Sequence, residues 1–86
     1  MDFETHRILA DNAFKKVEEM YQSNNHEFDL EMLHFAHVAR LHYAYTAIDR
    51  ADQRMQEAIK KADEMLIKVY LKLGLVEAAK FIEDHR

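Results

Sequence analysis

The six residues DRADQR, at positions 49–54, decide whether the middle of this chain is one helix or two. They are the most polar stretch between Leu30 and Leu73, a segment without Gly, Pro, Ser or Asn. Asp49 or Asp52 could cap a new helix, but nothing here signals the end of the preceding one. Apolar residues keep a seven-residue spacing through the stretch, at Leu41, Ile48, Met55, Ala62 and Val69. We therefore expect one continuous helix over residues 30–73, with a chain reversal near Asp49 as the alternative.

Helices are also expected on both sides of this segment. An apolar stripe predicts a first helix from about Phe3 to Tyr21, with Asp2 as its N-cap. The residues QSNNHEFD, at 22–29, predict a turn that ends in an N-cap at Asp29. Gly74 is suited to the position after a helix end, where a left-handed backbone is needed, and residues 75–86 predict a short last helix.

Composition predicts an all-α protein. The chain has 86 residues, of which 49% are hydrophobic and 33% charged, with one glycine and no proline. These values indicate a single helical domain over residues 1–86, because sheets joined by many turns draw on both glycine and proline. The expected architecture is a small helical bundle. It is a helical hairpin with a long central helix and a short C-terminal helix, or a compact four-helix bundle if the chain reverses near Asp49.

Charge and cysteine content indicate the cellular compartment in which we expect the protein. The chain has no cysteine and a net charge of −4. Its first residues, MDFETHRILADN, are acidic where a secretion signal would be basic, and no apolar run approaches the ~20 residues of a membrane span. We expect a cytoplasmic protein that binds no membrane. Basic residues are interrupted by acidic ones, so we do not expect the protein to bind nucleic acid.

The stretch LEMLHFAHVARLHYAY, at residues 30–45, is apolar on two sides of its predicted helix. His34 and His37 fall in the main stripe beside Leu41, and we expect them to be neutral and packed, with pKa values below the ordinary value. His42 and Tyr43 lie on other faces, so the three histidines should not converge. A helix that is apolar on two sides is expected to be buried on two sides. The remaining histidines, expected in solvent, are His6, His26 and His85.

A metal site is the more specific functional hypothesis for the same stretch. Glu31 and His34 form a Glu-x-x-His pair, which resembles the ligand spacing of ferritin-like di-iron bundles over these four residues. Such a centre would need a second copy of the chain, with Glu18 or Glu27 as possible further ligands. We expect no metal and no cofactor, because packed or solvated histidines are the commoner outcome.

The function expected from these patterns is protein binding rather than catalysis. Ser23 is the single serine and Gly74 the single glycine, so neither a supported nucleophile nor a phosphate-binding loop is present in the sequence. A continuous helix of 44 residues would extend about 66 Å and outrun the other helices, so we expect a homodimer that also binds another protein.

The expected module is non-enzymatic, a small regulator or adaptor that acts through helix–helix contacts. Its contact residues are expected along one seam, at Leu41, Ile48, Met55, Ile59 and Leu66. A second face is expected at Met32, Ala36, Tyr43 and Ala47. The alternatives are a dimeric metal-binding bundle that uses Glu31 and His34, and a nucleic-acid accessory protein.

Overall fold

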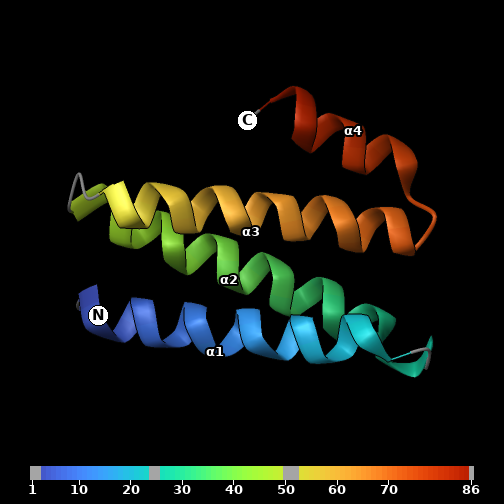
Figure 1. Ribbon diagram of the computed structural model, residues 1–86, viewed down its shortest axis with the longest axis horizontal. Coiled ribbons are helices and arrows are strands. Elements are labelled where there is room, and N and C mark those ends of the chain that lie inside the picture. The colour runs from blue at the N-terminus through green and yellow to red at the C-terminus, as the bar shows by residue number, and fades with distance from the viewer. Residues whose placement is uncertain (1–2, 24–25, 50–52, 86) are drawn as a thin grey trace.

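The computed structural model describes residues 3–23, 26–49 and 53–85, apart from the side chains at 47–49. It contains the four helices α1 (Phe3–Gln22), α2 (Asp29–Asp49), α3 (Gln53–Lys72) and α4 (Val76–Asp84), with a short 3-10 turn, η1 (His26–Phe28), before α2 (Figure 1). The described residues include no strand. The all-α helical bundle expected from composition is therefore confirmed.

The chain reverses between α2 and α3, so the expectation of one continuous helix is wrong and its alternative is correct. α2 runs antiparallel to α1 and to α3, which leaves α1 and α3 parallel to each other (Figure 1). The seven-residue spacing did not mark one buried stripe, because Leu41 is 49% exposed whereas Ala62 and Val69 are buried. The candidate caps Asp2 and Asp52, and the side chain of Asp49, lie outside the described residues.

The core lies where α1, α2 and α3 meet. Its larger buried side chains are Val17 of α1, Met32 of α2, and Leu66 and Val69 of α3. A second cluster consists largely of alanines, with Tyr43 as its one large member, at Ala10, Ala13, Ala39, Tyr43 and Ala62. Small side chains let helices approach closely, so the alanine cluster draws α1 and α3 onto the same side of α2.

α2 buries one of the two faces that were expected to be buried. Met32, Ala36 and Tyr43 are buried, while Leu30 is 81% exposed and Leu41 is half exposed. Leu33 and Val38 of the main stripe are partly buried against the core, so the expected burial of that stripe is correct only in part. The physical reason is steric, because the alanine-rich face admits two neighbouring helices more closely than the leucine-rich face would.

An ion pair joins α2 to α3 at the edge of the bundle. Arg40 Nε donates to Asp63 Oδ1 over 3.0 Å, and the carboxylate of Asp63 is almost fully buried. A buried carboxylate is costly unless it is paired, so this contact favours the observed register between the two antiparallel helices.

The end of α3 has the geometry expected from Gly74. Gly74 has a φ of +79°. Its N–H donates to the carbonyl of Leu71 over 3.0 Å, and the N–H of Leu75 donates to that of Tyr70 over 2.8 Å. These two bonds form the Schellman motif, so the expected helix end is confirmed. α4 then folds back beside α3, with which it makes its main contacts.

The parallel helices α1 and α3 are tied together at their C-terminal ends. Lys72 Nζ donates to the carbonyl oxygen of Tyr21 and, over 3.2 Å, to that of Ser23. The same ammonium lies 4.6 Å above the Tyr21 ring. A cation at the last carbonyls of a helix is favourable, because those groups are unpaired and carry partial negative charge. None of the described helices has the length and apolarity needed to cross a membrane.

Candidate interaction surface between α1 and α3

A groove runs between α1 and α3 on the side of the bundle where α2 does not cover them. One hollow in it has a volume of about 270 Å³ and is lined by Phe14, Tyr43, Arg54, Glu57, Ala58 and Lys61. A second hollow of about 180 Å³ is lined by Glu18, Tyr21, Gln22, Met65 and Lys68. We call these residues together the α1–α3 groove. It exists because α1 packs on α2 and α2 packs on α3, while α1 and α3 make few close backbone contacts.

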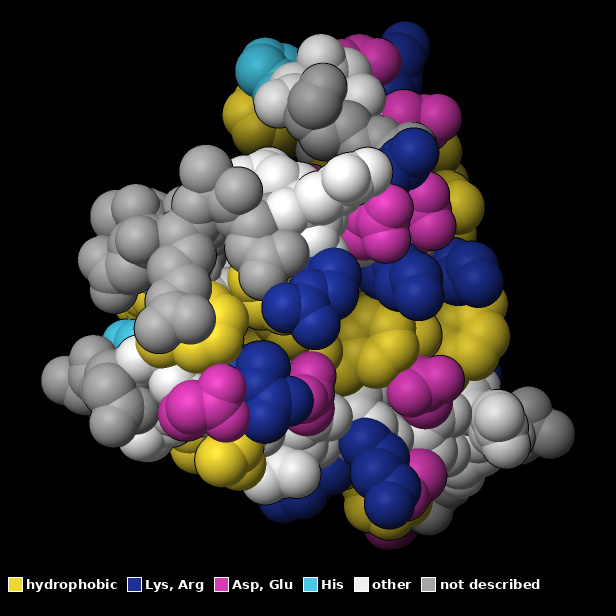
Figure 2. All heavy atoms as spheres, turned by 60° about the vertical axis from the view of Figure 1, so that its left-hand side comes forward, with side chains coloured by type: hydrophobic (Ala, Val, Ile, Leu, Met, Phe, Trp, Pro, Cys, Tyr) yellow, Lys and Arg dark blue, Asp and Glu magenta, His cyan; other side chains and the backbone are white. Residues whose placement is uncertain are grey.

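The floor of the groove is apolar and its edges are charged (Figure 2). Phe14 and Ala58 are partly buried members of the floor, and Tyr43 reaches it from α2. The edge on α1 has exposed acidic side chains at a seven-residue spacing, Glu4, Asp11 and Glu18. The edge on α3 has exposed basic side chains at the same spacing, Arg54, Lys61 and Lys68. A seven-residue spacing keeps each row along one line of its helix.

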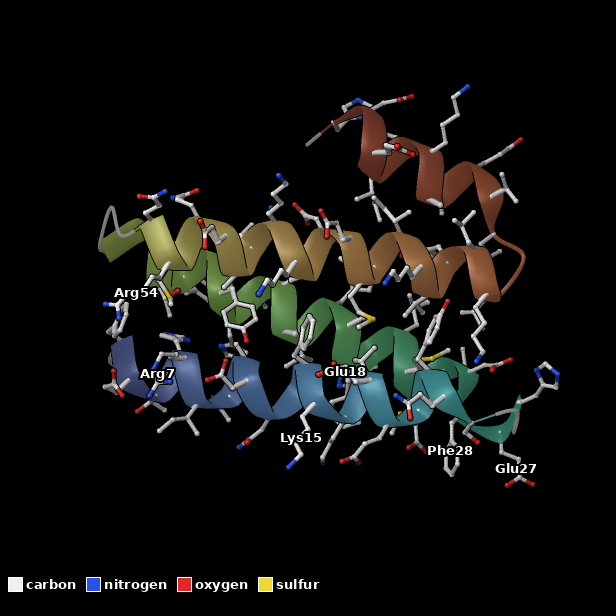
Figure 3. The ribbon with its side chains drawn as sticks, in the orientation of Figure 1. Arg7, Lys15, Glu18, Glu27, Phe28 and Arg54 are labelled. Atoms are coloured by element: carbon white, nitrogen blue, oxygen red, sulfur yellow. The ribbon has the colours of Figure 1, made fainter. Side chains whose placement is uncertain are left out.

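The two rows begin at the same end of the bundle. Figure 3 shows Arg7 of α1 and Arg54 of α3 near that end, and Glu18 further along α1. Glu18 and Lys68 line the same hollow, as do Phe14 and Lys61. The groove therefore has an acidic and a basic edge that are level with each other along its length.

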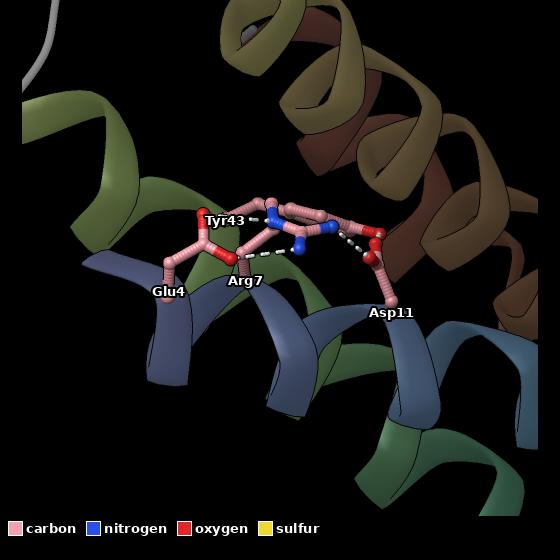
Figure 4. A network of polar contacts seen from close by, with 4 residues as sticks. All are labelled: Glu4, Arg7, Asp11 and Tyr43. Atoms are coloured by element: carbon pink, nitrogen blue, oxygen red, sulfur yellow. Dashed lines mark hydrogen bonds and ion pairs between the residues drawn. The ribbon is translucent and has the colours of Figure 1, made fainter. Parts of the chain in front are cut away.

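A polar network anchors the acidic edge (Figure 4). Arg7 donates to Glu4 Oε2 over 2.9 Å and to Asp11 Oδ2 over 3.1 Å, and the hydroxyl of Tyr43 donates to Asp11 Oδ1. The hydrogen bond with Glu4, and its charge, raise the pKa of Arg7. Burial, and then the hydrogen bond to Asp11, raise the pKa of Tyr43 well above its usual value. Tyr43 therefore remains a neutral donor that holds Asp11 in place.

His34 and His37 are not packed in an apolar seam, because both are exposed. His37 nevertheless has a partner on α3, with its Nε2 2.7 Å from the hydroxyl of Tyr70. Partial burial against that residue, and then the charge of His34, lower the pKa of His37. The expected direction of the pKa is therefore confirmed for His37, although the expected burial of both side chains is wrong.

The other histidines divide into a pair and two exposed side chains. The Nδ1 atoms of His6 and His42 are 2.8 Å apart, and the ring of Tyr45 lies 5.0 Å from that of His6. His6 is half-buried, so its expected place in solvent is wrong, whereas His26 and His85 are exposed as expected. His42 was expected to lie apart from His34 and His37, and its partner is indeed a residue of another helix, His6 of α1. Sequence patterns missed the pair because its members are 36 residues apart.

The predicted contact residues do not form one surface. Met32, Ala36, Tyr43 and Leu66 are buried between the helices of this chain, which corrects their expected place at an interface. Met55 and Ile59 are partly buried and Leu41 is half exposed. The side chains of Ala47 and Ile48 lie outside what the structure describes. The α1–α3 groove was not expected from the sequence, although the seven-residue spacing of charges along α1 and α3 was a usable signal.

The candidate metal ligands Glu31 and His34 are both exposed on α2. Within the described ranges, no group of three or more His, Cys, Asp or Glu side chains is arranged to hold a metal ion. The possible further ligands Glu18 and Glu27 lie apart, one along α1 and one in η1 (Figure 3). The single chain thus gives the Glu31–His34 pair no third ligand among those residues.

The fold and the groove together define a small all-α bundle whose described residues include an open groove between two parallel helices. Comparison with known proteins finds no matching family model, no matching curated protein and no matching solved structure.

Proposed function

We propose that this protein is a non-enzymatic helical protein–protein interaction module that binds through the α1–α3 groove. The observation that supports the proposal is the apolar floor, which lies open between two charged edges. Exposed apolar surface in a concave site is characteristic of grooves that receive a helix from another chain. A docked helix would cover Phe14 and Ala58 and place its own charged side chains against the two edges.

The proposed surface replaces the one expected from sequence. The long continuous helix that first suggested a homodimer is absent, so that reason for self-association no longer holds. The groove supplies a different reason for self-association, because a helix of a second chain could pack between α1 and α3 there. No comparable observation on the described residues favours the two alternative functions, metal binding and nucleic-acid binding. Among the described residues the Glu31–His34 pair has no third ligand, and the basic edge of the groove faces an acidic edge that would repel phosphate.

The test compares one substitution in the groove with one outside it. Ala58→Arg places a long charged side chain over the apolar floor, whereas Leu41→Arg changes the exposed face of α2. We expect Ala58→Arg to abolish self-association and the retention of other proteins by the purified chain, while Leu41→Arg leaves both unchanged. Sedimentation and co-purification measure the two effects, and thermal melting checks that both variants fold.

Two results would contradict the proposal. In the first, Leu41→Arg abolishes binding and Ala58→Arg does not, which would place the contact on the outer face of α2. In the second, the wild-type chain remains monomeric and retains no other protein.

A further inference from the structure

We propose that the occupant of the α1–α3 groove is a second copy of this chain, in a dimer whose two-fold axis runs parallel to α1 and α3. This inference rests on the proposed function, because it names the partner of the same groove. Three observations support the inference. They are the register of α1 and α3, the signs of the charges along the two helices, and the two-fold symmetry with which those signs are compatible.

The first observation is that α1 and α3 are parallel and in register. The bond from Lys72 to the carbonyl of Tyr21 places the last turns of the two helices side by side. Further along, Glu18 shares a hollow with Lys68. Residues whose numbers differ by about fifty therefore lie level with each other across the groove.

The second observation is that level positions have charges of opposite sign. Four pairs of residues exactly fifty positions apart in the sequence follow this pattern, namely Glu4 with Arg54, Arg7 with Glu57, Asp11 with Lys61, and Glu18 with Lys68. The pattern includes the reversed pair of Arg7 and Glu57, so the match follows individual positions as well as the overall charge of each edge. Such alternation gives a contact a defined register.

Symmetry then selects one arrangement of two copies. A two-fold axis parallel to the helices brings α1 of each copy opposite α3 of the other at the same level. In each of the four pairs the acidic residue of one copy then faces the basic residue of the other, and each pairing occurs twice. A two-fold axis across the helices would instead bring α1 against α1, with acidic residues facing acidic residues, which is unfavourable. The surface is therefore complementary to itself only in the parallel arrangement.

The size of the face is compatible with a stable dimer. Two helices of 20 residues each present a face about 30 Å long and about 20 Å wide, or roughly 600 Å² per copy. A standard protein interface buries about 800 Å² per partner, which this face and the flanking side chains approach. The dimer would cover the apolar floor at Phe14, Tyr21, Ala58 and Met65.

The first experiment measures the dimer dissociation constant by sedimentation equilibrium. We expect the wild type to approach twice the 10.3 kDa mass of the chain at micromolar concentration. Glu18→Lys and Lys68→Glu should each raise the dissociation constant roughly tenfold, because a two-fold dimer contains each contact twice. The double variant Glu18→Lys/Lys68→Glu should restore wild-type dimerisation, because the opposite signs are restored.

A matched control is the neighbouring glutamate, Glu19, which lies on the α1–α2 side of the same helix. Glu19→Lys changes the net charge as Glu18→Lys does, so it should leave the dissociation constant unchanged. The charges could also match only because α1 and α3 attract each other within one chain. In that case Glu18→Lys would lower the melting temperature of the monomer without changing association, and the inference would be overturned.

The second experiment tests the relative orientation of the two copies by disulfide cross-linking. Because the chain has no cysteine of its own, only the introduced cysteines can form a disulfide. Glu18→Cys protein is mixed with Lys68→Cys protein and oxidised, and a covalent heterodimer is expected. A mixture with Arg54→Cys is the control, because Arg54 lies about 21 Å from Lys68 along α3. Cross-linking in the control mixture alone, or equally in both, would overturn the parallel arrangement.

The outcomes separate this inference from the proposed function. A chain that stays monomeric, yet retains another protein in a way that Ala58→Arg abolishes, overturns the second copy as occupant and supports the groove as a docking site. A dimer that Ala58→Arg does not weaken overturns both proposals.

Discussion

Tyr43 links the groove to the core of the bundle. Its ring is buried in the alanine cluster, and its hydroxyl donates to Asp11 on the acidic edge. Periodicity places Tyr43 correctly on a second apolar face of its helix, but it does not identify Asp11 as the partner of the hydroxyl. The contact joins residues 32 positions apart, which no local pattern relates.

Substitution of Tyr43 by phenylalanine should be visible at alkaline pH. The pKa of Tyr43 is raised in the folded chain, so the unfolded chain loses its proton first, near pH 10. The free energy of unfolding should therefore fall as the pH rises above about 10. Tyr43→Phe should lessen that fall and cost about 1 kcal/mol at neutral pH, because Asp11 loses a hydrogen bond. Urea melts between pH 7 and pH 11 measure both effects.

Tyr45→Phe is the control for this experiment, because the ring of Tyr45 is 44% exposed. Its alkaline profile should match that of the wild type. If Tyr43→Phe and Tyr45→Phe give the same profile, the buried hydroxyl does not act as described.

The lowered pKa of His37 predicts that the free energy of unfolding also depends on pH in the acidic range. Its pKa is lowered in the folded chain, so the unfolded chain takes up a proton first as the pH falls below about 6.5. Its contribution to stability is therefore complete above pH ~6.5 and is lost as the pH falls through the folded pKa. Urea melts from pH 8 to pH 5 should show a smaller acid loss for His37→Gln than for the wild type. His26→Gln, whose side chain is 92% exposed, is the control, and an equal change in both variants would refute the role of His37.

At the scale of single elements, α2 was the most difficult helix to interpret. Its sequence is apolar on two sides, so periodicity gives two candidate buried faces and no means of choosing between them. The choice depends on how closely α1 and α3 approach, which the alanines of one face permit. In α1 and α3 the hydrophobic residues lie on one stripe, and their buried residues include Val17 in α1 and Leu66 and Val69 in α3.

Two substitutions in α2 separate the expected from the observed buried face. Met32 is fully buried, so Met32→Ala should lower the free energy of unfolding by about 2–5 kcal/mol. Leu41 is half exposed, so Leu41→Ala should cost less than about 1 kcal/mol in the monomer. Chemical denaturation at low protein concentration measures both values. A larger cost at Leu41 than at Met32 would restore the face that periodicity suggested.

At the scale of the whole molecule, α4 is the least integrated helix. Its main contacts are with α3 alone, and Ala79 is its one buried residue among those described. Phe81 is 62% exposed. A helix with little buried surface opens at a lower free energy than the global transition.

Hydrogen exchange should therefore divide the bundle into two parts. The amides of α4 should exchange well before those of α2, which is covered by both α1 and α3. Mass spectrometry of exchanged peptides from residues 76–84 and 29–49 makes the comparison. Equal protection of both peptides would show that α4 belongs to the same cooperative unit.

The sequence by itself determined the all-α class, the first helix, the start of the second helix near Asp29 and the helix end at Gly74. These features depend on residues within one or two turns of each other, through helix propensity, capping and backbone conformation. The tertiary structure alone decided the reversal after α2, its buried face and the level charges of the groove. Each of these depends on contacts between residues far apart in the chain, such as Arg40 with Asp63 and Lys72 with Tyr21. A polar stretch such as DRADQR is compatible with a continuous helix or a chain reversal, and the burial of α3 against α1 and α2 favours the reversal that these helices show.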